Sequence, residues 1–177
     1  ILANNNSISF EQAKTNIGKK SLKEKMSMIK RLVAKRSHFD EWVDAAFQMV
    51  NVNVEFTSDI GAVRDLRRHQ KNERCEALYT LDMGYSTPRD VVLMGLEAKR
   101  RFSEAMKKAH TAEKQIGKQF PYQVQYILPM ATLTTLRMNM DLDQIQYMIY
   151  TRSTPEGHES YRWDVFHLCE AICRVYP

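Results

Sequence analysis

Residues 50–75 read VNVNVEFTSDIGAVRDLRRHQKNERC, and this stretch joins the clearest strand of the sequence to its most basic helix. Its first seven residues alternate between apolar side chains (three valines and Phe56) and polar ones (two asparagines and Glu55). A period of two with β-branched residues is typical of a strand that buries one face. Ser58 is a suitable N-cap, and Asp59 would lie in the first turn of a helix that follows directly. The stretch therefore predicts a strand that leads into a helix.

The predicted helix carries a concentrated positive charge. If it continues past Leu66, basic side chains at i, i+3, i+4 and i+7 share one face, namely Arg64, Arg67, Arg68 and Lys71. Arginine presents a planar fork of donors to phosphate oxygens, so this face suits an anionic ligand. The alternative is a solvated basic face with surface ion pairs, and the pattern alone leaves both interpretations open.

A second strand, followed by a helix, is predicted in the C-terminal half. Residues 132–140 alternate, with Leu136 on the apolar face and Arg137 on the polar one. Asp141 is placed to cap a helix that runs to Arg152. Arg152 continues the apolar stripe of that helix. It therefore either has a buried partner or reaches water at the helix C-terminus, where the helix dipole favours a cation.

The rest of the chain is predicted to be mainly helical. Residues 1–18 are polar and weakly patterned, which indicates a linker or N-terminal extension before a single domain over residues 19–177. Gly95 is expected to permit a close helix contact. His38 is interpreted as a structural histidine. Further helices are predicted over 21–35, 40–47, 87–115 (with Thr87 as N-cap and Pro88 as the first helical residue) and from Glu156 onward.

Composition bounds the class of protein. The 177 residues carry a net charge of +5, and 44% of them are apolar, which is enough for one folded domain. The three cysteines lack metal-ligand spacing, so we expect reduced thiols in a cytoplasmic protein and no metal site. No apolar run reaches membrane-spanning length. The positive charge is compatible with nucleic acid or with phosphorylated small ligands.

Motifs in both halves resemble one enzyme family. Arg68-His69-Gln70, Asn72-Glu73-Arg74-Cys75 and Tyr79 are similar to the signature of the flavin-dependent thymidylate synthases, in which Arg-His-Arg precedes Asn-Glu-x-Ser and Arg-Tyr. In the C-terminal half, Leu128-Pro129, Thr134, Asp141 and Arg152 follow the order and spacing of that family. The resemblance covers about residues 20–175. A start at Ile1 would fit one domain of a tandem-domain member.

The resemblance implies an α/β (α+β) fold with an antiparallel sheet flanked by helices, assembled as a homotetramer or as a pseudo-tetramer of tandem domains. It implies FAD bound between subunits, with NADPH as the reductant and dUMP and methylenetetrahydrofolate as substrates. The flavin would carry the hydride, so no catalytic side chain is expected. The implied cofactor-binding residues are Arg68, His69, Asn72, Glu73, Arg152 and His158. The implied substrate-binding residues are Glu73, Cys75 and Arg162, with Arg162 near the dUMP phosphate.

Three departures from the family pattern concern charge. Gln70 and Leu78 replace arginines, and Asp143 stands where the family has another nucleotide-binding arginine. They leave three functions open: a working FAD-dependent thymidylate synthase or one of its domains, a catalytically degenerate domain with a structural or regulatory role, and a basic nucleic-acid-binding module. The last is least favoured, because residues 60–74 contain no aromatic side chain for base stacking.

Overall fold

The computed structural model describes residues 8–34 and 47–176, except for the side chains of Leu32 and Val33. The chain divides into two compact units, residues 1–50 and 51–177. The candidate site lies in the second unit. Among the described residues, no helix is both long enough and apolar enough to cross a lipid bilayer.

The first unit contains two capped helices, α2 (Phe10–Gly18) and α3 (Leu22–Val33), and the short 3-10 helix η1 (Phe47–Met49). Ser9 caps α2 and Ser21 caps α3, each in a reciprocal capping box with the residue three positions later. Helix α3 confirms its prediction. Helix α2 was not predicted, because its sequence is polar and only its cap signals it. His38 and residues 40–46 of the predicted short helix lie outside the described residues.

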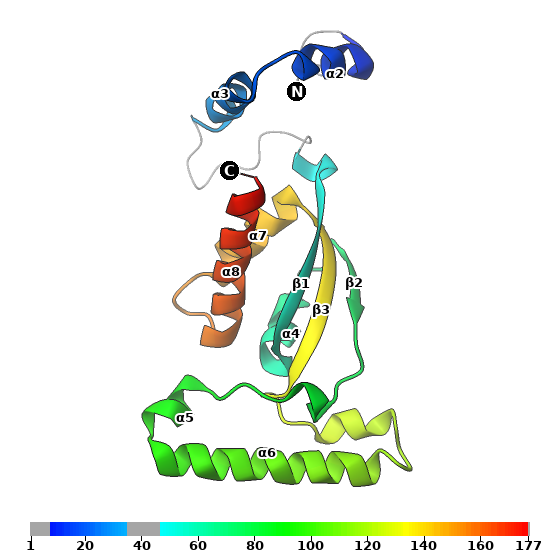
Figure 1. Cartoon of the computed structure of the whole chain (residues 1–177), viewed down its shortest axis with the longest axis vertical. Coiled ribbons are helices and arrows are strands. Elements are labelled where there is room, and N and C mark those ends of the chain that lie inside the picture. Colours follow the sequence, from blue (N-terminus) through cyan, green and yellow to red (C-terminus); the bar gives the residue numbers. More distant parts are fainter. Residues whose placement is uncertain (1–7, 35–46, 177) are drawn as a thin grey trace. The chain divides into compact units, whose positions relative to one another are not determined.

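The second unit is built on a three-stranded antiparallel sheet of order β1-β3-β2 (Figure 1). Its strands are β1 (Asn51–Asp59), β2 (Glu73–Glu76) and β3 (Leu133–Asp141). The register places Phe56 opposite Leu136 and Glu55 opposite Arg137. The two predicted strands are therefore confirmed, and so is the fold class of an antiparallel sheet flanked by helices. Strand β2 was not predicted, because its sequence ERCE lacks apolar alternation.

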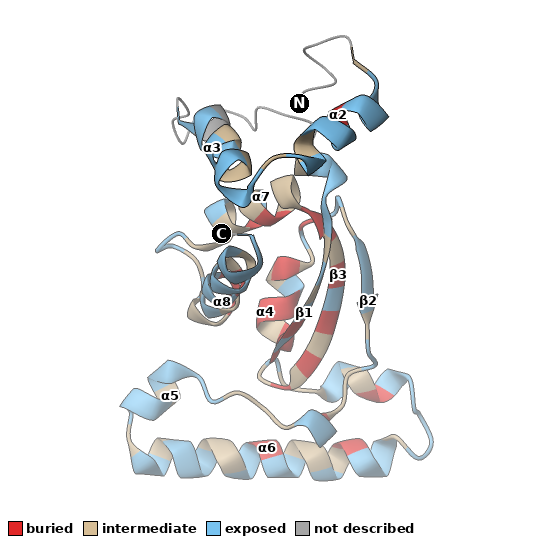
Figure 2. Ribbon diagram, turned by 45° about the horizontal axis from the view of Figure 1, so that its top comes forward, coloured by how far each residue is buried: buried red, intermediate tan, exposed pale blue. Residues whose placement is uncertain are grey.

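One face of the sheet is covered by the helices α4 (Ile60–Leu66), α7 (Leu142–Arg152) and α8 (Glu159–Val175). Figure 2 shows buried residues concentrated on β3 and α4, and the same core includes buried residues of α7 and α8. Leu136, Met138 and Met140 project from β3 into this core, together with Val63, Met148 and Val165 from the three helices. Burying each such side chain contributes about 1.5–3 kcal/mol. The sheet therefore holds α7 and its C-terminal arginine in a fixed place.

The helix after β1 is shorter than predicted. Ser58 belongs to β1 and is not the N-cap; the cap is Asp59, whose Oδ1 accepts a hydrogen bond from the Ala62 N–H at 2.8 Å. The helix ends at Leu66, so Arg68 and Lys71 lie in the following loop. The prediction that four cations share one helical face is therefore wrong, because the helix ends before Arg67, Arg68 and Lys71.

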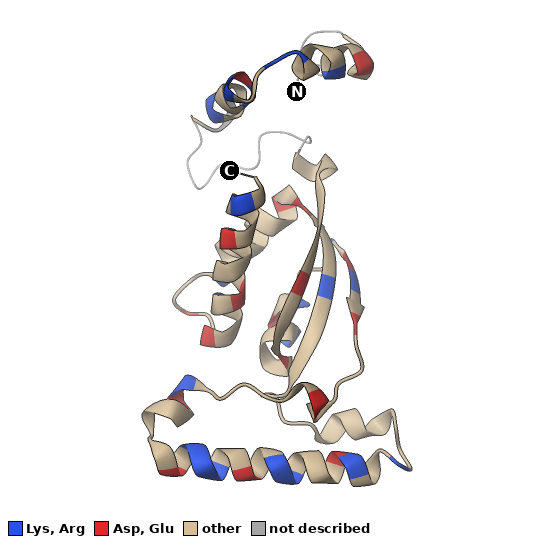
Figure 3. Cartoon of the chain, viewed as in Figure 1, with Lys and Arg blue, Asp and Glu red and all other residues tan. Residues whose placement is uncertain are grey.

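The single helix expected over residues 87–115 is also divided. Pro88, not Thr87, is the N-cap of α5 (Arg89–Leu93), and α6 (Leu96–Ile116) follows a break at Gly95. Gly95 has a φ of 94°, a conformation that L side chains rarely adopt, and no atom would meet an added Cβ within 4 Å. Gly95 therefore permits the turn between α5 and α6, and the expected close helix contact at this glycine is wrong. Opposite charges are interspersed along α6, which lies across one end of the sheet (Figure 3).

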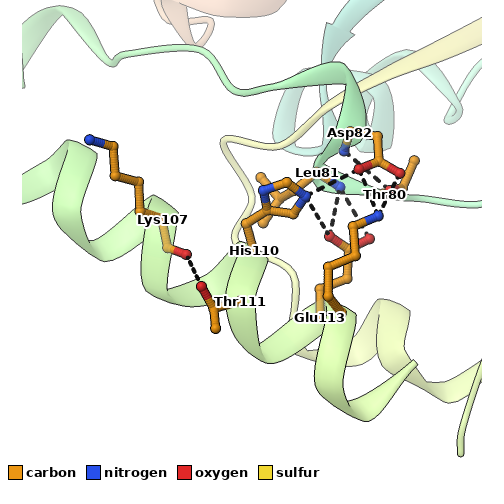
Figure 4. A network of polar contacts seen from close by, with 8 residues as sticks. Thr80, Leu81, Asp82, Lys107, His110, Thr111 and Glu113 are labelled. Atoms are coloured by element: carbon orange, nitrogen blue, oxygen red, sulfur yellow. Dashed lines mark hydrogen bonds and ion pairs between the residues drawn. The ribbon is translucent and has the colours of Figure 1, made fainter. Parts of the chain in front are cut away.

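A buried carboxylate attaches α6 to the segment that follows β2. Glu113 is 5% exposed, and its two oxygens accept hydrogen bonds from the Leu81 backbone N–H at 3.3 and 3.2 Å (Figure 4). Leu81 begins the 3-10 helix η2 (Leu81–Met83), which follows β2. Asp82 of the same turn contacts His110 at 3.1 Å and Lys114 at 2.7 Å. These contacts hold α6 against the segment between β2 and α5.

We expect Glu113→Leu to lower the free energy of unfolding by about 1–3 kcal/mol, because the buried Leu81 N–H loses its acceptor. Glu113→Gln keeps an oxygen acceptor and should cost less. Glu104→Gln, on the exposed side of the same helix, is the control and should change stability by about 0.5 kcal/mol or less. Urea unfolding of the three variants measures the differences. A Glu113→Leu variant as stable as the parent would contradict this role.

Candidate functional site

The loop between α4 and β2 brings two predicted site residues together. His69 lies in this loop, and Arg152 is the last residue of α7. The Arg152 Nε–H donates to His69 Nε2 at 3.1 Å, although the two residues are 83 positions apart. The Arg152 guanidinium also lies over the ring of Tyr161, 5.9 Å from its centroid. The sequence left open whether Arg152 has a buried partner or reaches water. The structure gives it a buried partner, His69.

His69 is buried and uncharged. It is 6% exposed, and its ring meets Tyr147 of α7 edge to face with centroids 5.7 Å apart. Burial, and to a lesser degree the adjacent charge of Arg152, lowers the pKa of His69 to about 4. At neutral pH the imidazole of His69 is therefore uncharged. It accepts a hydrogen bond from Arg152 and places no second positive charge beside the guanidinium.

The same loop is fixed at several points. The Asn72 side-chain amide donates to the His69 carbonyl, while its buried Oδ1 has no partner among the described residues. Lys71 forms an ion pair with Asp141 at 3.3 Å and approaches Asp143 at 4.0 Å. Arg68 is exposed and pairs with Asp65 at 3.0 Å. Of the two adjacent predicted residues, His69 thus faces Arg152, whereas Arg68 faces solvent.

Glu73 and Cys75 lie on the other face of the sheet. They pair with Asn139 and Arg137 of β3, whose side chains point away from the helices. A shallow hollow of about 440 Å³ is lined there by Glu73, Cys75 and their neighbours. The floor of the hollow includes an ion pair between Arg137 and Glu55. Cys75 is an exposed thiol.

His158 and Arg162 lie at the start of α8. His158 is the N-cap, and its Nδ1 accepts a hydrogen bond from the Ser160 N–H at 3.3 Å. The Arg162 guanidinium lies over the Phe166 ring at 5.9 Å, and its buried Nε has no partner among the described residues. The helix begins at Glu159, three residues after the predicted Glu156, and His158 has a capping role that the sequence did not show.

Four of the predicted site residues form two groups in one copy of the chain. His69 and Arg152 lie on the helical side of the sheet, and Glu73 and Cys75 line the open face. The first group, with the neighbouring Asn72, fits part of a flavin cofactor, because the described residues leave the Nη donors of Arg152 and the buried Oδ1 of Asn72 for a ligand. Within one copy, these groups do not converge on a single pocket of the described residues.

Sequence reasoning missed a polar cluster beside this loop. Glu76 of β2 accepts from Arg67 at 3.2 Å and from the Tyr79 hydroxyl at 3.3 Å, and it pairs with Arg74 at 3.6 Å. Burial and the Glu76 charge raise the pKa of Tyr79. Arg67 and Arg74 therefore both form ion pairs with the Glu76 carboxylate. The sequence held no signal for this, because a contact between loop and strand has no fixed spacing.

Asp164 of α8 is a half-buried carboxylate that lies near Ser58 and Asp59 at the end of β1. Burial and the nearby charge of Asp59 raise the pKa of Asp164 to about 6, against the opposing effects of a hydrogen bond with Ser58 and of His167. Its Oδ2 is buried without a partner among the described residues. Asp164 of α8 is therefore destabilising when it is ionised.

We expect Asp164→Asn to be more stable than the parent by about 1–2 kcal/mol at pH 7. The folded pKa lies above the ordinary value of 3.8, so the parent has its full stability below about pH 4 and loses it as pH rises through 6. Asparagine does not ionise, so the gain should vanish at pH 4. Urea unfolding at both pH values measures this, with Glu170→Gln on the same helix as the control. Equal stabilities at pH 7 would contradict the account.

The chain has relatives of greater length. The family model of the thymidylate synthase complementing protein matches residues 2–177. A UPF0159 protein of Chlamydia muridarum is 34% identical over 123 residues, which is 70% of this chain and 23% of that protein. A UPF0159 protein of Thermoplasma acidophilum is 27% identical over 157 residues, or 88% of this chain and 31% of that protein. The chain spans less than a third of the length of these curated relatives.

An antiparallel sheet covered on one face by helices, with an arginine held at the end of α7, defines a mixed α/β domain. The match over nearly the whole chain assigns the family: this protein belongs to the thymidylate synthase complementing protein family. Membership confirms the family resemblance found in the sequence.

Proposed function

We propose that this chain is a FAD-binding domain of a flavin-dependent thymidylate synthase and that Arg152 contacts the flavin. The observation that carries the proposal is the setting of Arg152. Its Nε is bound to neutral His69 and its plane lies over Tyr161, which leaves its Nη donors for a ligand. An arginine fixed in this way suits the electron-rich edge of a flavin or a phosphate oxygen. Arg68 and Asn72 would extend the cofactor site along the same loop.

When bound, the flavin would supply the hydride that completes the methyl group of thymidylate, with NADPH as reductant and methylenetetrahydrofolate as the carbon donor. The protein would contribute binding and charge. Glu73, Cys75 and Arg162 are proposed to contact dUMP, and His158 to contact the cofactor. Since Glu73 and Cys75 lie on the open face, we propose that the site is completed by another copy or another domain of a longer protein, as in a tetramer or pseudo-tetramer.

The test is conversion of dUMP to thymidylate by the purified chain supplied with FAD, NADPH and methylenetetrahydrofolate. Thymidylate formation that depends on all three would support the proposal. Light scattering of the same sample tests assembly, and we expect a homo-oligomer. A monomer at micromolar concentration that still formed thymidylate would contradict a site shared between copies.

A second candidate function is supported by the ion pairs of Lys71. Gln70, Leu78 and Asp143 remove positive charge where the family places arginines, and Lys71 is already paired with Asp141. The domain would then bind flavin but little or no dUMP, and would serve a structural or regulatory role. Calorimetry with dUMP distinguishes the candidates. Gln70→Arg combined with Asp143→Arg should tighten binding if this alternative holds, whereas tight binding by the parent would exclude it.

A further inference from the structure

We propose that His69 is a positioning residue that holds Arg152 in the orientation in which it meets a ligand, and that His69 does not itself contact that ligand. This rests on the proposed function for the identity of the ligand, but not for the orientation of Arg152. His69 was expected from the family resemblance to bind the cofactor directly. Its burial and its bond to Arg152 support an indirect role.

The chemistry of the hydrogen bond fixes the state of the imidazole. An arginine side chain stays protonated in proteins, so Arg152 Nε always carries hydrogen and can only donate. His69 Nε2 must therefore present its lone pair, and the single imidazole proton lies on Nδ1. A doubly protonated ring would place N–H against N–H and two positive charges side by side. The low pKa of His69 is consistent with this neutral form.

The packing around the pair restricts both partners. Tyr147 contacts the His69 ring edge to face, and the His69 carbonyl is bound by the Asn72 side chain. Tyr161, 9% exposed, lies under the Arg152 guanidinium. Among the described residues, no carboxylate forms an ion pair with Arg152 within 4.0 Å. The arginine is thus oriented by a neutral acceptor and an aromatic face, neither of which neutralises its charge.

This arrangement has a consequence for binding. A free arginine side chain loses rotamer entropy when a ligand immobilises it. Pre-orientation by His69 removes part of that cost before the ligand arrives. A carboxylate in place of His69 would orient Arg152 equally well, but it would compensate the charge that an anionic or electron-rich ligand requires.

Two variants at position 69 separate positioning from contact. His69→Gln keeps an acceptor near the place of Nε2, whereas His69→Phe keeps a ring against Tyr147 but removes the acceptor. We expect His69→Phe to raise the dissociation constant for FAD about tenfold and His69→Gln to raise it less than about threefold. Titration by quenching of flavin fluorescence measures both, with His110→Gln on α6 as the control. If both variants weaken binding equally, or if His69→Phe binds like the parent, the proposal is overturned.

A second readout does not depend on flavin. Nitrogen NMR of the imidazole should show the proton on Nδ1 at neutral pH. The Arg152 Nε–H signal should exchange slowly in the parent and in His69→Gln and rapidly in His69→Phe. If the parent binds no FAD, the proposed function fails, and the NMR result alone decides the positioning role. An Arg152 Nε–H that exchanges as fast in the parent as in His69→Phe overturns it.

Discussion

Arg152→Ala should raise the dissociation constant for FAD by about 10- to 150-fold, because hydrogen bonds to a charged group contribute about 1.5–3 kcal/mol and each 1.4 kcal/mol is tenfold in affinity. The alanine variant loses the Nη donors and the positive charge together. Arg152→Lys keeps the charge but lacks the planar fork and the stacking surface, so we expect it to recover only part of the affinity.

The control for this prediction is Arg100→Ala, which removes an arginine from α6 that pairs with Glu97 and Glu104. It lowers the net charge by the same amount and should leave FAD affinity unchanged. Urea unfolding of Arg152→Ala separates a local loss of binding from a loss of folding. An alanine variant that is folded and binds FAD with the parent's affinity would remove Arg152 from the site.

Leu136→Ala should lower the free energy of unfolding by about 2–5 kcal/mol. Leu136 lies at the centre of the middle strand, is 0% exposed, and packs among residues of the helical layer. Alanine would leave a cavity that the sheet cannot close, because β3 is paired on both edges. Such a loss is a large part of the stability of an ordinary domain.

Arg137→Ala is the matched control, since the next residue on β3 points to the open face and pairs with Glu55. It should cost about 1 kcal/mol or less. Chemical unfolding of both variants therefore tests the register as well as the core. A one-residue slip of β3 would exchange the two faces, so a larger loss for Arg137→Ala than for Leu136→Ala would contradict the described register.

Local signals in the sequence predicted the elements that carry their own pattern. β1 and β3 alternate with a period of two, and Asp141 both ends β3 and caps α7 through the Gln144 N–H at 2.7 Å. These features depend on residues that are close in the sequence, so the sequence alone predicts them correctly. The predicted extent of α7, ending at Arg152, was confirmed for the same reason.

Other elements depend on contacts that local patterns do not encode. Ser58 and Asp59 are both good N-caps, and pairing of β1 with β3 up to Asp59 selects the second. Likewise, β2 is a polar strand that forms because β3 offers it a partner. The contact of His69 with Arg152 joins residues 83 positions apart, so the sequence could show only that Arg152 needed a partner.

Retention of flavin by the purified full chain tests the central claim most directly. The protein is incubated with FAD, free cofactor is removed by gel filtration, and the visible absorbance of oxidised flavin in the protein peak is measured for the parent, Arg152→Ala and Arg100→Ala. We predict that the parent and Arg100→Ala retain flavin and that Arg152→Ala loses most of it. A parent that retains no flavin, or an Arg152→Ala variant that retains as much as the parent, would contradict a FAD site at Arg152.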